Sequence, residues 1–109
     1  MAGITEAIAT ALFCTLAQGE IEARHDYEHG YIRVDCETVN HVIEAGLDKR
    51  SSLDSAQQAV FAAILTNKIP VVIIYDTDGI EGKYEYRIRK TCEYLGIDYY
   101  NPNVTQWIK

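Results

Sequence analysis

The chain has 109 residues, a formal net charge of −6 at pH 7 and 48% hydrophobic residues, which is enough for one compact domain over residues 1–109 and too little for two. With only 2 prolines and 7 glycines, the composition excludes a disordered or repeat protein. The first residues lack the basic start of a signal peptide, and their apolar stretch is too short to cross a bilayer, so we expect a cytoplasmic location. The acidic balance disfavours sequence-blind binding of nucleic acid by charge alone.

Three cysteines stand far apart among apolar neighbours, at Cys14, Cys36 and Cys92. Their odd number and wide spacing predict three buried thiols rather than disulfides or a metal cluster. The histidines do not change this expectation, because no Cys or His pair shows the short spacing of zinc ligands.

Hydrophobic periodicity in the first half of the chain predicts one helix followed by three strands. The helix covers residues 3–17, with apolar residues at helical spacing, and ends at Gly19. The first two strands are joined by a turn at Glu28-His29-Gly30. The three expected strands are residues 21–27, 31–37 and 41–47.

The second half predicts a helix over residues 51–66, capped by Ser51 or Ser52, and then a continuous apolar strand over residues 69–75. A further helix carries an apolar face from Tyr84 to Leu95, and a short last strand follows it. The order αβββαβαβ indicates an α/β fold in which a mixed sheet lies between helical layers.

The second and third strands bring two carboxylates together. If a turn at Val39-Asn40 joins these strands, Asp35 lies directly opposite Glu44, roughly 5 Å away at Cβ. Like charges at that separation repel unless a cation lies between them, and hard oxygen ligands suit Mg²⁺ or Mn²⁺. The alternative is a solvated strand face, salt-bridged through Arg33. The same register predicts one apolar face containing Ile32, Val34, Cys36, Ile43, Ala45 and Leu47.

The element order and four short motifs resemble the PD-(D/E)XK nuclease superfamily, whose restriction-endonuclease-like core has the order αβββαβ. The motifs are Gly19-Glu-Ile-Glu-Ala-Arg24, Tyr31-Ile-Arg-Val-Asp-Cys-Glu-Thr38, His41-Val-Ile-Glu-Ala45 and Ala56-Gln57-Gln58. The resemblance covers roughly residues 4–75.

The resemblance implies a role for each matching residue. Asp35 and Glu44 match the two acidic metal ligands, and the main-chain carbonyl of Ala45 is a further ligand. Gln57 matches a glutamine that one branch of the superfamily carries near the metal. Glu22 joins this acidic face if the first hairpin closes at Glu28-His29, because it then lies opposite Asp35.

The sequence departs from the superfamily pattern at the lysine. Two residues beyond Glu44 the pattern has a lysine that orients the attacking water, and this chain has Gly46. Three cations are candidates to replace it: Lys49, which we prefer, Arg50, and Arg33, which the expected register places opposite Gly46. Arginine stays charged, so it would stabilise charge without acting as a base.

Two features of the C-terminal half have other interpretations. Asp76 and Asp78 resemble the DxDG signature of haloacid-dehalogenase-like phosphatases, but too little chain follows for the rest of that site, and a turn capping the next helix is expected instead. Lys83, Arg87 and Lys90 form a basic stripe on the last helix, which either contacts phosphates or is merely solvated.

The resemblance therefore predicts a Mg²⁺- or Mn²⁺-dependent nuclease acting on DNA, with Asp35 and Glu44 at its centre. A chain this small cannot surround a duplex, so we expect a homodimer or a subunit of a larger complex. The alternative is a catalytically inactive protein of the same fold that binds protein or nucleic acid, in which Gly46 records the lost lysine.

Overall fold

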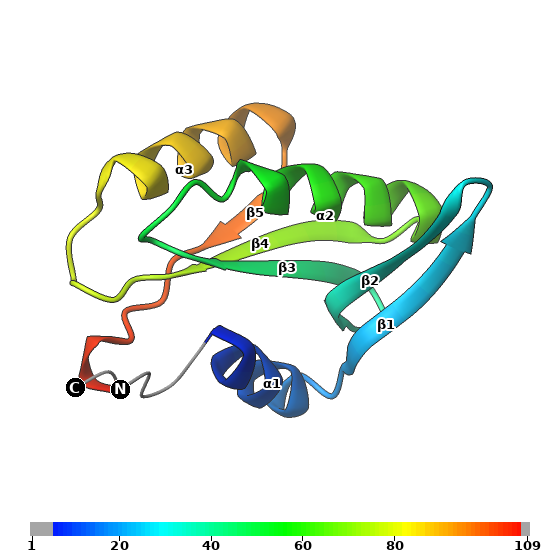
Figure 1. Cartoon of the computed structure of the whole chain (residues 1–109), viewed down its shortest axis with the longest axis horizontal. Helices are drawn as coiled ribbons and strands as arrows, with labels where there is room; N and C mark the ends of the chain where they lie inside the picture. The colour runs from blue at the N-terminus through cyan, green and yellow to red at the C-terminus, as the bar shows by residue number, and fades with distance from the viewer. Residues whose placement is uncertain (1–5, 108–109) are drawn as a thin grey trace.

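The computed structural model describes residues 6–107. Five strands form one sheet in the order β1-β2-β3-β4-β5. Helix α1 lies on one face, and α2 and α3 lie on the other (Figure 1). The elements are α1 Glu6–Leu16, β1 Glu20–Tyr27, β2 Gly30–Glu37, β3 His41–Leu47, α2 Leu53–Thr66, β4 Ile69–Tyr75, α3 Lys83–Leu95, β5 Asp98–Tyr100 and a 3₁₀ turn η1 Thr105–Trp107.

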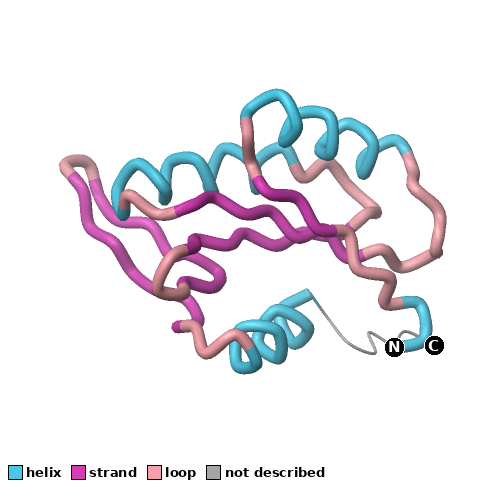
Figure 2. The backbone as a smooth tube through the Cα atoms, turned by 180° about the vertical axis from the view of Figure 1, so that it is seen from behind, coloured by secondary structure: helices cyan, strands magenta, loops and turns pink. Residues whose placement is uncertain are grey.

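The sheet is mixed, as the element order predicts. Strands β1, β2 and β3 form an antiparallel meander, whereas β3, β4 and β5 run parallel. Helix α2 makes the crossover between β3 and β4, so the carboxyl ends of these strands meet at one edge of the sheet (Figure 2). The prediction of an α/β fold with helices on both faces is confirmed.

Strand β4 is covered on both faces, which explains its continuous apolar sequence. Alternate residues point toward α1, and the intervening ones point toward α2 and α3. The α1-side core contains Ala9, Cys14, Cys36, Ile43, Ala45, Val71, Ile73, Tyr75 and Val104. The opposite core contains Ala56, Ala59, Val72, Ile74, Ile88, Cys92 and Ile97.

The prediction of three free thiols is wrong for two of them. Cys14 of α1 and Cys36 of β2 form a disulfide, with 5.7 Å between their Cα atoms, a separation that suits such a bond. The pairing arises because α1 packs across β2 and buries both side chains completely. Gly19 permits this approach, because a Cβ there would lie 2.7 Å and 2.8 Å from the two sulfur atoms. Cys92 is a free buried thiol, as expected.

The predicted single apolar face of β2 is also wrong. Cys36 packs with Ile43 beneath α1, whereas Val34 packs with Val42 and Ala62 on the side of α2. The strand thus changes face between Val34 and Cys36. The β1–β2 ladder is interrupted at this level, where the opposing Glu22 has a left-handed φ of 56°. Such an irregular residue disrupts pairing and increases local twist.

No helix within residues 6–107 is long and apolar enough to cross a membrane.

Candidate functional site

Asp35 and Glu44 lie opposite each other where β2 and β3 separate. The turn between the strands has the expected register, with Glu37 paired with Val42 and Cys36 paired with Ile43. The β2–β3 pairing stops at that pair. Beyond it, the backbone N–H of Ala45 donates to a side chain of β2, Asp35 Oδ2, at 2.9 Å. The Asp35 carboxylate thus replaces a ladder bond, and the strands part beyond it.

Glu44 is buried and Asp35 is half-buried, and the two carboxyl groups lie close enough to affect each other's pKa. Glu44 is 3% exposed, and burial together with repulsion from Asp35 raises its pKa to about 8. Burial raises the pKa of Asp35 as well, assisted by Glu22 and Glu6, while the Ala45 N–H acts in the opposite direction. The pair therefore holds a proton at neutral pH unless a cation replaces it.

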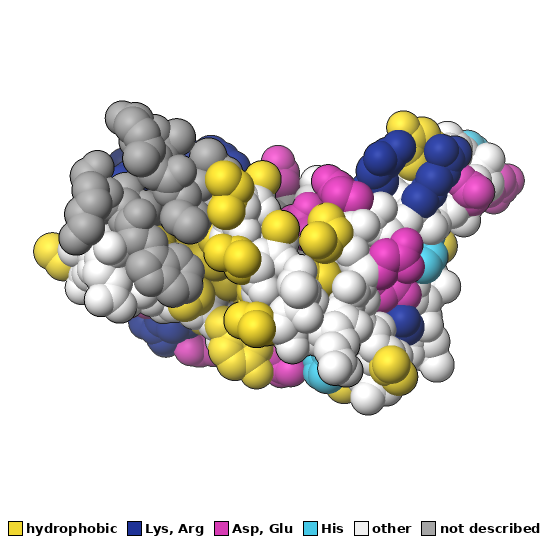
Figure 3. All heavy atoms as spheres, turned by 90° about the horizontal axis from the view of Figure 1, so that it is seen from below, with side chains coloured by type: hydrophobic (Ala, Val, Ile, Leu, Met, Phe, Trp, Pro, Cys, Tyr) yellow, Lys and Arg dark blue, Asp and Glu magenta, His cyan; other side chains and the backbone are white. Residues whose placement is uncertain are grey.

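Asp35 lines a pocket between α1 and the β1–β2 hairpin, with a cavity of about 450 Å³. Glu22 and Glu6 line the same pocket, and Glu22 lies opposite Asp35 as the hairpin register predicts, since the turn closes at Glu28-His29. Figure 3 views the molecule from this side, and its surface mixes hydrophobic patches with acidic and basic side chains. The pocket thus reaches Asp35 from the α1 side, whereas Glu44 does not line it.

The three candidate cations occupy different places. Arg50 Nη2 lies 2.9 Å from Glu6 Oε1 and so reaches the rim of the Asp35 pocket. Lys49, the preferred candidate, instead has its Nζ 3.8 Å from Asp78 Oδ2. Arg33 is not opposite Gly46 as expected, because the β2–β3 ladder stops at Cys36, and Arg33 pairs with Arg24 of β1.

Gly46, which stands where the resemblance implies a lysine, is in close contact with α2 and β4. A Cβ at this position would lie 2.7 Å from Ser52 Oγ and 3.1 Å from Ile74 Cδ1. Ser52 is at the N-cap position before α2, but its hydroxyl does not cap the helix and donates instead to the Leu47 carbonyl at 3.2 Å. The seat of α2 on β3 therefore leaves no room for a lysine side chain.

Gln57 does not join the acidic pair. It is exposed and lines a groove between α2 and α3 together with Phe61 and Thr91. The α2 residue that faces the strand is Ser55, whose Oγ donates to the Ala45 carbonyl at 3.4 Å. The helix turns Ser55 inward and Gln57 outward, so the glutamine match does not extend to the site.

A second acidic cluster lies beyond the carboxyl end of β3. It contains Asp48, Asp76, Asp78 and Glu85, and one carboxylate oxygen from each lies within 4.8 Å of the others. The expected turn is present here, since Asp76 Oδ1 accepts hydrogen bonds from the N–H groups of Asp78 and Gly79. It does not cap α3 as expected, because the N-cap of that helix is Gly82. Sequence reasoning missed the cluster, although a parallel β3–β4 pair would have brought Asp48 beside Asp76.

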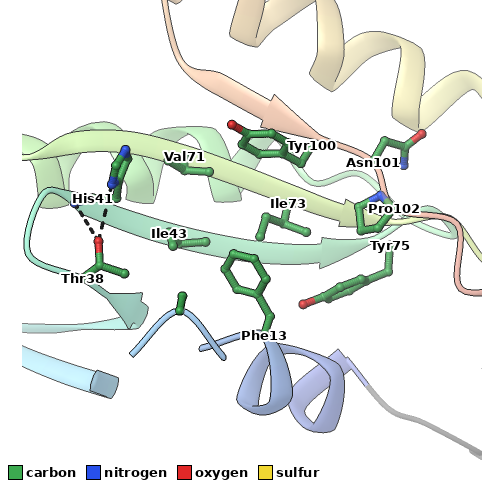
Figure 4. Close-up of a pocket in the computed structure, with 11 residues that line it drawn as sticks. Phe13, Thr38, His41, Ile43, Val71, Ile73, Tyr75, Tyr100, Asn101 and Pro102 are labelled. Atoms are coloured by element: carbon green, nitrogen blue, oxygen red, sulfur yellow. Dashed lines mark hydrogen bonds between the residues drawn. The ribbon is translucent and has the colours of Figure 1, made fainter. Parts of the chain in front are cut away.

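The pocket beside α1 on the sheet face is apolar and carries no carboxylate. It has a volume of about 600 Å³, and Phe13, Ile43 and Ile73 point into it (Figure 4). Its polar margin is formed by His41, whose backbone N–H donates to Thr38 Oγ1 at 3.1 Å. This lining does not suit a phosphodiester or a hard metal ion.

A scan against protein-family models gave no match, and searches of curated proteins and of solved structures gave none either.

Proposed function

We propose that the protein is a metal-dependent nuclease with a restriction-endonuclease-like core, which hydrolyses phosphodiester bonds of DNA at Asp35 and Glu44. The observation that carries the proposal is the placement of these two carboxylates on adjacent strands where the β2–β3 ladder ends. The parallel β3–α2–β4 unit agrees with the core that the sequence motifs imply.

The oxygen donors present at the pair suit Mg²⁺ or Mn²⁺. Asp35 retains one oxygen beyond the Ala45 bond, Glu44 contributes its carboxylate, and the Ala45 carbonyl retains a lone pair beside the bond from Ser55. When bound, such an ion activates water and neutralises charge on the phosphodiester. Asp35 and Glu44 would hold the ion between their carboxylates, which lie on adjacent strands.

Positive charge lies at the rim of the pocket rather than among its lining residues. Arg50 forms an ion pair with Glu6, which lines the pocket. Its guanidinium would stabilise negative charge on the phosphate, because it does not lose its proton. Lys49 lies beside the other acidic cluster, so we assign the replacement of the motif lysine to Arg50. The α1 residues Ala7 and Thr10 line the pocket on the side of the helix.

The hairpin offers the basic and aromatic surface nearest to the pocket along β1 and β2. Arg24 lies 3.9 Å from the centre of the Tyr31 ring and Arg33 lies 5.6 Å from it. Such a group can contact phosphates and stack on bases. The basic stripe of α3 lies on the opposite side of the sheet from α1, so the hairpin is the better candidate for DNA contact.

The proposal includes a homodimer, because cutting both strands of a duplex requires two sites facing opposite strands. It also includes a cytoplasmic location. Reducing thiols in that compartment would act to reduce the Cys14–Cys36 disulfide.

The alternative function is a catalytically inactive nuclease-fold module that binds protein or nucleic acid. Two observations favour it: Gly46 has no room for the lysine, and Gln57 faces away from the pair. It predicts DNA or protein binding without hydrolysis.

The test is cleavage of supercoiled plasmid and branched DNA in Mg²⁺ or Mn²⁺ by the wild type and by Asp35→Asn, Glu44→Gln and Glu28→Gln. Glu28 is an exposed carboxylate in the hairpin turn, so its variant is the matched control. We expect cleavage by the wild type and the control, with at least a hundredfold loss in the other two. DNA binding without cleavage supports the inactive module, and cleavage that survives both substitutions overturns the assignment of the site.

A further inference from the structure

The second acidic cluster joins three elements that are distant in the sequence. Asp48 follows β3, Asp76 and Asp78 follow β4, and Glu85 lies in the first turn of α3. The carboxyl ends of parallel strands are a common place for ligands in α/β folds. Glu44 and Asp48 are four residues apart, roughly 13 Å along an extended chain, so this cluster is distinct from the Asp35 pocket.

Negative charge in the cluster is poorly compensated. Asp48, Asp76 and Glu85 are buried, and Asp78 is exposed. Within residues 6–107, Lys49 is the only basic side chain that forms an ion pair with any of the four, at 3.8 Å from Asp78. The amino end of α3 supplies only a partial positive charge. Carboxylates this close in the interior repel one another unless a proton or a cation lies between them.

Local donors satisfy several oxygens of the cluster. Thr77 donates to Asp48 through both its backbone N–H, at 2.7 Å, and its hydroxyl, at 2.8 Å. Asp78 Oδ1 accepts the N–H of Ile80 at 3.0 Å. These bonds fix the loop, and one carboxylate oxygen of each of the four residues still lies within 4.8 Å of the others.

One buried oxygen of the cluster has no hydrogen-bond partner. Glu85 is 1% exposed, and its Oε1 accepts the N–H of Gly82 at 2.7 Å, whereas its Oε2 is unpartnered. The neighbouring Asn101 amide donates to the Ile74 carbonyl at 2.7 Å. Its interaction with Glu85 lowers the pKa of that carboxyl group, against the larger raising effect of burial. The Tyr99 hydroxyl is itself unpartnered, so it does not satisfy Glu85. A buried carboxylate oxygen without a partner is unfavourable, and a cation would satisfy it.

We propose that Asp48, Asp76, Asp78 and Glu85 form a second divalent cation site, independent of the Asp35–Glu44 pair. The ligands are oxygen atoms, and neither Cys nor His belongs to the cluster. The site would therefore take a hard ion such as Mg²⁺ or Ca²⁺ rather than Zn²⁺. The ion would link the carboxyl ends of β3 and β4 to the first turn of α3. Because it binds the folded state, it would stabilise the fold by mass action.

Two measurements are made on the full chain: its thermal unfolding in Mg²⁺ or Ca²⁺, and calorimetric titration with each ion. NaCl at the same ionic strength controls for the general effect of salt. The variants are Glu85→Gln, which retains an oxygen for the Gly82 N–H, and Asp76→Asn. Glu44→Gln removes the first proposed site and leaves the second cluster intact. The matched control is Glu28→Gln, which changes an exposed carboxylate in the hairpin turn. Because a variant can fail to fold, Mn²⁺ broadening of backbone amide signals is measured in the wild type.

We expect either divalent ion to raise the unfolding temperature of the wild type, of Glu28→Gln and of Glu44→Gln, because the second cluster is intact in all three. Glu85→Gln and Asp76→Asn should bind at least tenfold more weakly. Mn²⁺ should broaden the amides of Thr77, Asp78 and Gly79. No upward shift at millimolar ion, an equal shift in the Glu85 variant, or unbroadened amides at residues 77–79 would overturn the second site. None of these outcomes depends on DNA cleavage, so failure of the nuclease proposal is distinguished from failure of this one.

Discussion

Glu44 lies opposite Asp35 where the β2–β3 ladder ends, in a nearly solvent-free position with only 3% of its surface exposed. The separation of β2 from β3 produces this arrangement, because Asp35 takes over the backbone N–H of Ala45. Two acids in such a position share a proton or bind a cation. The same local irregularity thus explains both the parting of the strands and the electrostatics of the pair.

Replacing Glu44 by Gln should weaken the pH dependence of stability in metal-free protein. The pKa of Glu44 is raised to about 8 by burial and by Asp35, so its stabilising contribution is full below the unfolded pKa and is lost as pH rises through the folded one. A folded-state pKa that lies one pH unit above the unfolded-state pKa corresponds to about 1.4 kcal/mol of unfolding free energy. The wild type should therefore lose on the order of 4 kcal/mol between pH 4.5 and 8.

Denaturant unfolding at pH 5, 7 and 9 in the presence of a chelator measures this effect. The wild type should lose stability with rising pH, and Glu44→Gln should lose much less. Asp35 and Glu85 also have raised pKa values, caused first by burial, and both remain in the variant. An identical pH dependence in the two proteins would show that Glu44 is not buried as a neutral acid.

Reducing the Cys14–Cys36 disulfide should destabilise the protein. The bond closes a loop with a sequence separation of 22, and the chain-entropy description predicts a loss of about 3 kcal/mol. Denaturant unfolding with and without reductant checks this, with Cys92→Ala as the thiol control. Peptide mapping of the unreduced protein should recover residues 14 and 36 in one linked fragment, and recovery of three free thiols would contradict the bond.

Introducing a side chain at Gly46 should destabilise the protein by about 1–3 kcal/mol. A Cβ there would lie 2.7 Å from Ser52 Oγ and 3.2 Å from Ser52 Cβ. Removing the Ser52 side chain should relieve part of the clash, so Gly46→Ala should cost less in a Ser52→Gly background than in the wild type. A double-mutant cycle of unfolding free energies tests the contact, and simple additivity would contradict it.

Arg50 and Lys49 should differ in their effects on DNA cleavage, because they point to different acidic groups. Arg50 contacts Glu6 at the Asp35 pocket, whereas Lys49 contacts Asp78. Arg50→Ala should lower the cleavage rate at least tenfold, and Lys49→Ala should leave it nearly unchanged. Rates measured with saturating DNA separate this effect from substrate binding, and the reverse order would return the role to Lys49.

The order of elements and the two hairpin registers could be predicted from the sequence because they depend on local patterns. Short turns fix strand register, so the placement of Asp35 opposite Glu44 followed from the residues around Val39-Asn40. The β3 and β4 ranges follow from runs of apolar residues that the structure confirms.

What the sequence did not predict depends on contacts between distant elements. The disulfide requires α1 to lie across β2, and the outward direction of Gln57 depends on how α2 rotates on the sheet. The distance of Arg33 from Gly46 depends on where the β2–β3 ladder stops. Neither periodicity nor motif spacing contains that information.

The central claim, that Asp35 and Glu44 hold a divalent cation, is tested most directly by calorimetric titration of Mn²⁺ in a protein whose second cluster is disabled. The Asp76→Asn, Glu85→Gln double variant provides that background, and Glu44→Gln is added to it for comparison. We predict one bound ion in the double variant and none once Glu44 is replaced. Absence of binding at millimolar Mn²⁺, or binding that is unchanged without Glu44, would contradict the claim.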